Sequence, residues 1–212
     1  MGFLANVKYS ASYFCSITGC ESMDAFSYIS IVPSIIIALG ITRLLTGIGR
    51  ILEKRKKVHT YWVHLLWSLN VFLFMGLNWW IMFRWEPQPT WTFPLFMFLL
   101  LTPTVSFLLT VILFPDPFEE PIMNFKENYY EDHRWFFALA AMLPPLDFVD
   151  TLLKGVPHLL TQGPLYIITI LLMTILSIVA VLTKNQNYHK FFSIFFLIYI
   201  SVFILINLNV LV

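Results

Sequence analysis

Charged residues are scarce in this chain, and their scarcity excludes most soluble folds. Only 12% of the 212 residues are charged, whereas 58% are hydrophobic and 17% aromatic, and the mean hydropathy is +0.77. An ordinary soluble domain carries about 25% charged residues. The formal net charge is only +1, which gives no basic surface for nucleic acid. The composition therefore indicates a membrane protein that does not bind nucleic acid.

Motifs for common cofactors and common kinds of catalysis are also absent. The chain has no HExxH, GxSxG or P-loop motif and no TVGYG-like selectivity filter. No lysine lies in the middle of an apolar segment to hold retinal, and the five histidines are not placed as paired haem ligands. The two cysteines, Cys15 and Cys20, lack the spacing of a metal site. We expect no cofactor and no metal, and the absences favour a protein that is not an enzyme.

The first 25 residues lack the apolar pattern of the rest of the chain. They are too polar to span a membrane, and they lack the basic and apolar regions of a signal peptide. We predict a loose N-terminal tail over residues 1–25 with two incidental thiols. A disulfide is the alternative if the tail faces an oxidising space. Met23, just before the apolar chain begins, is an alternative natural start.

Six long apolar segments follow the tail and predict an all-α, polytopic membrane helix bundle. The first contains about 27 mostly apolar residues, enough at about 1.5 Å per residue to cross a hydrocarbon layer about 30 Å thick. Tryptophan and tyrosine mark both ends of the second, as is typical at membrane interfaces. The predicted single transmembrane domain covers residues 26–212, with spans at 26–52, 61–83, 91–114, 135–153, 159–183 and 191–212.

Prolines predict irregular geometry in two of these spans. A proline removes one backbone donor and leaves a carbonyl of the preceding turn unpaired. We expect a kink at Pro103 in the third span and a broken helix at Pro144 and Pro145 in the fourth. Functional breaks in transporter helices have this sequence pattern, and simple bends are the commoner alternative.

Small side chains recur at every fourth position of the first span. This small-residue ridge consists of Ser30, Ser34, Ala38, Thr42 and Thr46. Ridges of this kind let helices approach closely in lipid. We expect a homo-oligomer that associates through the ridge. Packing of the ridge inside the monomer is the alternative.

Charges inside the spans are candidates for a functional site, because a lone charge in a bilayer costs about 3 kcal/mol. Arg43 lies in the first span, and Asp147 and Asp150 lie in the fourth. Counted from the predicted span ends, Arg43 is about 13 Å and Asp147 about 18 Å from the same membrane face. We therefore predict that Arg43 pairs with Asp147, with Asp150 as a further candidate partner. The pair is interpreted as static, with a gating or transport site as the alternative.

Polar residues also share one stripe of the second span. At 100° per residue, His64, Ser68 and Asn78 project from the same face. Polar groups in a span usually face protein or water, so we expect this stripe to face the interior. His64 is interpreted as a hydrogen-bonded packing residue, and a proton-relay or ligand role is the alternative.

Lysine and arginine predict the orientation. The basic turn after the first span carries Lys54, Arg55, Lys56 and Lys57, and nine of the thirteen Lys and Arg residues lie on its side of the membrane. Such residues concentrate on the cytoplasmic side. We predict a multi-pass protein of the cell (plasma or inner) membrane with both termini outside the cytoplasm.

The predicted cytoplasmic loop over residues 115–133 is acidic. It holds six acidic residues and one lysine. We interpret it as a solvated loop. A cation-attracting vestibule and a docking site for a partner protein are the alternatives.

These features favour a small oligomeric channel or transporter for an ion or small solute. Charges inside spans and proline-interrupted helices are typical of such proteins. A non-catalytic membrane sensor or partner subunit is the alternative, because the ridge and short loops require no transport. A membrane-embedded enzyme is a third hypothesis.

Overall fold

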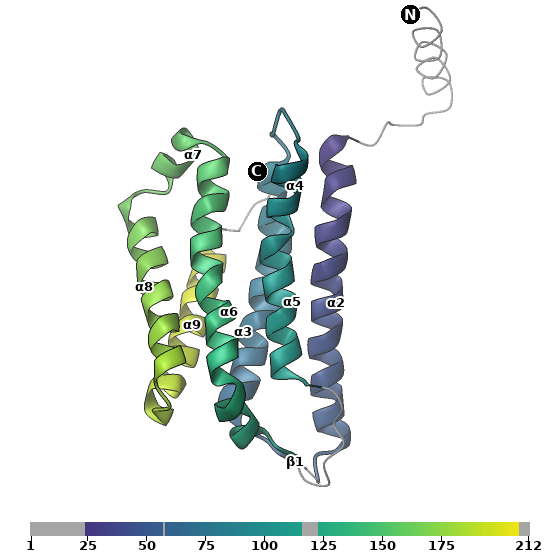
Figure 1. Cartoon of the computed structure of the whole chain (residues 1–212), viewed down its shortest axis with the longest axis vertical. Helices are drawn as coiled ribbons and strands as arrows, with labels where there is room; N and C mark the ends of the chain where they lie inside the picture. Colours follow the sequence, from purple (N-terminus) through teal and green to yellow (C-terminus); the bar gives the residue numbers. More distant parts are fainter. Residues whose placement is uncertain (1–23, 57, 116–122, 208–212) are drawn as a thin grey trace, which may run out of the picture.

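The computed structural model describes residues 24–56, 58–115 and 123–207. In these residues, six helical segments are long and apolar enough to cross a membrane, and they lie side by side (Figure 1). The predicted all-α membrane bundle is therefore confirmed. The spans are α2 (Ala25–Glu53), α3 (Trp62–Ile81) continued by the 3-10 helix η1 (Met82–Trp85), α4 (Phe93–Leu99) with α5 (Leu101–Leu113), α6 (Phe125–Leu153), α8 (Pro164–Leu182) and α9 (Gln186–Asn207). The tail cysteines lie outside the described residues.

Local sequence signals set where the helices begin. Asp24 precedes α2, and its side chain accepts a 2.7 Å hydrogen bond from the backbone N–H of Ser27, which lowers the pKa of Asp24. Gly155 precedes the short helix α7 (Val156–Thr161), and Gly163 precedes α8. Both glycines have positive φ, 113° and 73°, a conformation that other residues adopt with strain. The two glycines therefore allow the sharp turns between α6, α7 and α8.

The two ends of the bundle differ in charge. The basic end, at the bottom of Figure 1, contains the end of α2, the start of α6 and the α8–α9 turn. Its described cations are Arg50, Lys54, Arg55, Lys56, Lys126, Arg134, Lys184 and Lys190. A two-residue parallel pairing of β1 (Val58–His59) with β2 (Met123–Asn124) lies there. The other end, here the α7 end, contains α7, η1 and the start of α4.

Five helices surround the interior of the bundle. α6 packs along α5 and α8, while α3 packs along α9 and contacts α5. α2 lies outside this ring against α5 and α3. α8 and α9 contact each other only sparsely, and the hydroxyl of Tyr188 donates to the carbonyl of Leu176 close to their connecting turn (2.6 Å). The α8–α9 seam is therefore the least tightly packed side of the ring.

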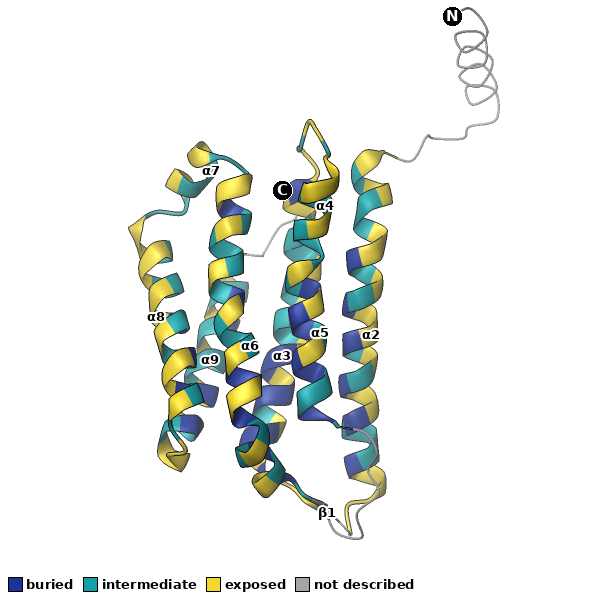
Figure 2. Ribbon diagram, in the orientation of Figure 1, coloured by how far each residue is buried: buried dark blue, intermediate teal, exposed yellow. Residues whose placement is uncertain are grey.

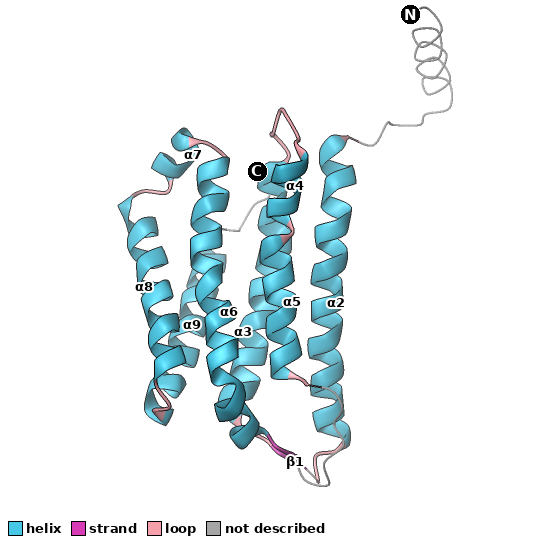
Figure 3. Cartoon of the chain, in the orientation of Figure 1, coloured by secondary structure: helices cyan, strands magenta, loops and turns pink. Residues whose placement is uncertain are grey.

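The third span is interrupted, and the fourth is not. α4 ends at Leu99 and α5 begins at Leu101, a short break visible in Figure 3. Pro103 has no N–H for the carbonyl of Leu99, four residues earlier, which accounts for the break there. By contrast, α6 continues through Pro144 and Pro145, so the predicted broken helix is wrong. Packing along α5 and α8 supports α6 where the two backbone bonds are lost.

α6 also begins ten residues before the predicted span, at Phe125. The side chain of Asn124 accepts a 3.1 Å hydrogen bond from the N–H of Lys126 and caps the first turn. At about 1.5 Å per residue, the helix is about 43 Å long and exceeds a hydrocarbon layer of about 30 Å. Its charged first turns therefore extend beyond the apolar region, and the second half of the predicted 115–133 loop is helical. Residues 116–122 lie outside the described residues.

Candidate functional site

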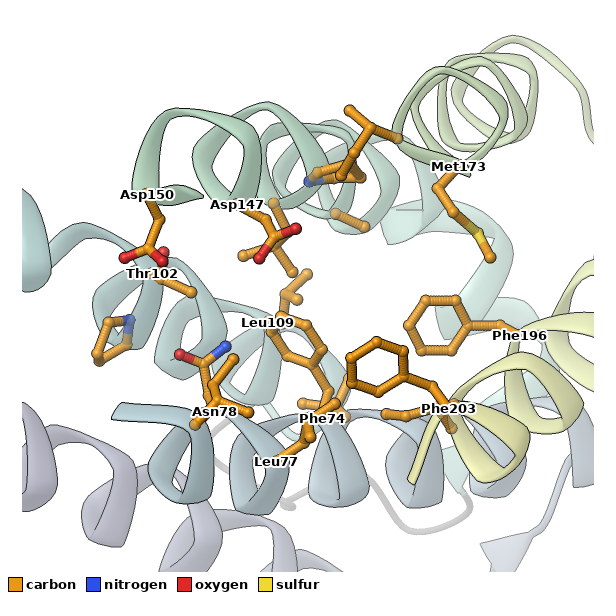
Figure 4. A pocket seen from close by; sticks show the side chains of 18 of the residues that line it. Phe74, Leu77, Asn78, Thr102, Leu109, Asp147, Asp150, Met173, Phe196 and Phe203 are labelled. Atoms are coloured by element: carbon orange, nitrogen blue, oxygen red, sulfur yellow. The ribbon is translucent and has the colours of Figure 1, made fainter. Parts of the chain in front are cut away.

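A cavity of about 170 Å³ lies inside the ring of helices. Its walls come mainly from α3, α5, α6, α8 and α9, with further residues from η1 and α4. Figure 4 shows side chains from these five main helices converging on the cavity. On α6 the lining residues are Phe136, Ala140, Leu143, Pro144, Asp147, Asp150 and Lys154. These positions recur at helical spacing, so one face of α6 lines the cavity over 19 residues, which span about 27 Å at 1.5 Å per residue. The cavity is thus elongated along the membrane normal.

The lining changes character along this length. Towards the basic end most of the lining side chains are large and apolar, including Trp67, Phe136 and Phe192, and the small polar Ser177 lies among them. Towards the α7 end it includes the polar residues Asn78, Thr102, Asp147, Asp150 and Lys154. A ligand in the cavity would therefore meet charged groups at one end only.

Asp147 points into the cavity from α6 (Figure 4). Its Oδ2 accepts a 2.9 Å hydrogen bond from the hydroxyl of Tyr166 on α8, which also approaches the Asp147 carbonyl (3.1 Å). A second contact joins this hydroxyl to Thr151 (2.9 Å). Among the described residues, no cation lies within ion-pair distance of Asp147. The partner of this membrane-embedded carboxyl is thus a neutral hydroxyl.

The negative charge of Asp150 is compensated more fully than that of Asp147. It forms an ion pair with Lys154, four residues later on α6, and accepts a 2.9 Å hydrogen bond from the indole N–H of Trp85. The ammonium of Lys154 also lies 5.0 Å from the centre of the Trp85 ring. Burial, followed by the charges of Lys154 and Arg84, lowers the pKa of His158 in the adjoining helix α7. The α7 end therefore favours an uncharged imidazole at neutral pH.

Aromatic rings close the cavity towards the basic end. The Trp67 ring contacts Phe136, Phe137 and Phe192 at centroid distances of 5.2–5.4 Å. These four residues are buried, and we call them the aromatic floor. Beyond the floor, His189 contacts the Tyr129 hydroxyl through Nδ1 (3.0 Å) and the Thr183 carbonyl through Nε2 (2.9 Å). Because a carbonyl only accepts, Nε2 carries the proton and Tyr129 donates to Nδ1.

The predicted pairing of Arg43 with Asp147 is wrong. Arg43 donates a 2.8 Å hydrogen bond to the carbonyl of Phe114, just after α5 at the basic end. Asp147 lies 22 residues into α6 and not 12 residues into a shorter span. The earlier start of α6 therefore moves Asp147 towards the α7 end, away from Arg43. Asp147 and Asp150 share the cavity, and Arg43 does not line it.

The structure divides the polar stripe of α3 between two places. His64 is buried, and its Nε2 donates to the carbonyl of Leu113 (2.8 Å). The hydroxyl of Ser68 donates to the carbonyl of His64 (3.0 Å). Asn78 lines the cavity from the other half of α3. His64 and Ser68 thus serve packing between helices, whereas Asn78 belongs to the candidate site.

Most of the small-residue ridge is not covered by the described part of the chain. Ala38, Thr42 and Thr46 are exposed, and Ser30 and Ser34 are half-buried. Figure 2 shows α2 buried on one side only, where the buried residues are Pro33, Ile37, Gly40, Leu44, Gly47 and Ile51. The hydroxyls of Ser34 and Thr42 bond to carbonyls of their own helix, each at 2.8 Å. The ridge therefore faces lipid or another protein.

Sequence reasoning missed several residues of the site. Lys154 was detectable, because it follows Asp150 at the i, i+4 spacing of a helical ion pair. Tyr166 and Trp85 gave no such signal, because their partners lie on other helices. The phenylalanines of α9 resembled ordinary lipid-facing residues, yet Phe192, Phe196 and Phe203 line the cavity.

Comparison with protein-family models, curated protein sequences and solved structures finds no match. The chain is a multi-pass integral membrane protein. In the described part of the chain, no three His, Cys, Asp or Glu side chains are grouped so that they could hold a metal ion.

Proposed function

We propose that the protein is a transporter for a small solute, which binds in the central cavity. The observation that carries this proposal is the position of Asp147, a carboxyl inside a membrane-embedded cavity that is closed at one end. Ionisable groups at such depth are costly and commonly mark solute or ion pathways. In this proposal, the aromatic floor closes the cavity towards the basic end.

The closed floor favours a carrier over a channel. A channel needs a continuous polar path, whereas Trp67, Phe136 and Phe192 fill the bundle below the cavity. Carriers instead hold the solute within the membrane and expose it to one side at a time. Conversion to the other state would require these rings to separate.

The walls of the cavity contain sites where helices can bend. Pro103, next to the interruption between α4 and α5, and Pro144 of α6 both line the cavity. Helices that lack backbone bonds next to a solute site are typical of transporters. This feature favours a carrier over a sensor with a rigid binding site.

The proposal can be tested without knowing the solute. In a background with Cys15 and Cys20 replaced by serine, Ser177→Cys places one thiol in the cavity wall. A membrane-impermeant maleimide is then added to either side of sealed vesicles of known orientation. A transporter predicts labelling from both sides, with slow labelling from the basic side, where the floor must open.

The matched control is Ile178→Cys, whose side chain lies one residue further on α8 and is exposed towards lipid. The reagent should not reach it from either side. Labelling of Ser177→Cys from the α7 end alone would contradict the proposal and indicate a receptor with a fixed floor. Rapid labelling from both sides would indicate a channel.

A further inference from the structure

The charges around the cavity do not balance. Asp150 and Lys154 neutralise each other in an ion pair, whereas the described partner of Asp147 is the uncharged hydroxyl of Tyr166. The two carboxyls and one lysine that line the cavity therefore sum to one negative charge when both carboxyls are ionised. A carboxylate inside the membrane is costly unless it has a partner of opposite sign.

We infer that the solute is a small organic cation, an amine attached to an apolar body about the size of one aromatic ring, with its ammonium group on Asp147. This inference rests on the proposed function, because it names the solute class for the same cavity. The ammonium would donate to Asp147 at the polar end. The apolar body would extend towards the aromatic floor.

The size and walls of the cavity fit such a molecule. A cavity of about 150 Å³ in another protein binds benzene, and this cavity has about 170 Å³. Phe74, Phe196 and Phe203 surround the space next to Asp147 (Figure 4). Their edges and faces offer apolar contact to a ring and cation–π contact to an ammonium group. One carboxyl among aromatic rings is thus complementary to an amphipathic amine.

Other solute classes fit less well. An anion would face the charge of Asp147, and the lysine that could attract it is already paired with Asp150. A metal cation would need several oxygen ligands at about 2.0–2.6 Å, whereas most of the lining side chains are apolar. A neutral apolar molecule would leave Asp147 without a counter-charge.

Three compounds of similar size and different charge test the inference. They are 2-phenylethylamine, 2-phenylethanol and 3-phenylpropionate, each radiolabelled and bound at equilibrium to the detergent-purified full chain. We expect the amine to bind at least about tenfold more tightly than the alcohol, which corresponds to one charge-assisted hydrogen bond. The carboxylate should bind most weakly. Equal binding of amine and alcohol, tighter binding of the carboxylate, or binding of none of the three would overturn the inference.

Two variants locate the binding. Asp147→Asn should remove the preference for the amine, whereas the matched control Glu131→Gln changes an exposed carboxyl of the same helix outside the cavity and should bind as the native chain does.

If Asp147→Asn does not fold, a second variant, Met173→Trp, adds volume inside the cavity. The larger side chain should occupy space that the amine needs and weaken its binding at least about tenfold. Its control is Leu172→Trp, on the lipid side of α8. Unchanged binding by Met173→Trp would place the amine elsewhere and overturn the inference.

The two proposals can fail separately. Binding of the amine through Asp147, with labelling of Ser177→Cys from the α7 end alone, would support the solute class and contradict transport. Two-sided labelling without a preference for the amine would support transport and overturn the solute class.

Discussion

Two glycines allow α2 to lie close to its neighbours. A Cβ at Gly40 would lie 2.2 Å from the terminal methyl of Met75, and one at Gly47 would lie 2.3 Å from the ring of Phe114. The methionine side chain is flexible. The Phe114 ring is buried and lies 5.1 Å from the ring of His64, so it has less freedom to move. Gly47 is therefore the more constrained of the two positions.

We expect Gly47→Ala to destabilise the bundle, because the added methyl group overlaps the Phe114 ring. Overpacking of this kind typically costs about 1–3 kcal/mol. The measurement is thermal or SDS-induced unfolding of the purified protein. Gly49→Ala is the matched control, since a Cβ there meets nothing within 4 Å, and its stability should be unchanged or slightly raised. Equal stability of the two variants would show that the α2–α5 contact is looser than described.

At the scale of elements, the interruption between α4 and α5 lies beside the cavity. Leu99 and Pro103 both line it, so a change in the angle between the two helices would change its shape. Pro33 also lies inside a helix, α2, but it is remote from the cavity. The two prolines thus allow a comparison between a bend at the site and one away from it.

We expect Pro103→Ala to stabilise the third span and slow the opening of the floor. The substitution restores a backbone N–H for the carbonyl of Leu99, and a helical proline costs up to about 3 kcal/mol. Labelling of Ser177→Cys from the basic side should then become several-fold slower. Pro33→Ala should leave this rate unchanged. An equal effect of both substitutions would argue against a local role for the bend.

The hydropathy of the sequence was enough to predict six spans, because each apolar segment must cross the hydrocarbon layer. It did not predict the true start of α6, since residues 125–134 are polar and their helix continues outside the apolar region. That error placed Asp147 at the depth of Arg43 and produced the wrong pairing. The site could be predicted only as far as the two carboxyls, Asp147 and Asp150, and the inward-facing Asn78. Contacts such as Tyr166 to Asp147 join different helices, and no local sequence spacing encodes them.

At the scale of the whole molecule, the basic end predicts the orientation in the membrane. Seven described lysines and arginines lie there beyond the last turn of α2 or at the starts of α6 and α9. In a background without Cys15 and Cys20, Lys56→Cys should react with an impermeant thiol reagent only after cells are permeabilised. Gln88→Cys, in the loop between η1 and α4, should react in intact cells. The reverse pattern would place the basic end outside.

The outward-facing ridge of α2 predicts self-association. Replacing Ser34 and Ala38 with leucine should weaken chemical crosslinking between copies, because larger side chains keep the helix backbones apart. Ile35→Leu with Leu39→Ile alters exposed positions beside the ridge while keeping their volume, and it should crosslink as the native chain does. Crosslinking that survives the Ser34 and Ala38 changes would remove the ridge from the interface.

The sparse contact between α8 and α9 offers a route by which a solute could enter the cavity from the lipid. Met173 on one side of this seam and Phe196 and Phe203 on the other line the cavity, and the seam itself faces the acyl chains. If the solute is the amphipathic amine inferred above, which dissolves in the bilayer, the lipid next to the seam would act as its reservoir. Occupancy by such an amine would then follow its concentration in the membrane, which is in equilibrium with its concentration in water. At a fixed total amount of amine, adding lipid would dilute this reservoir and lower occupancy, even though no residue of the protein had changed.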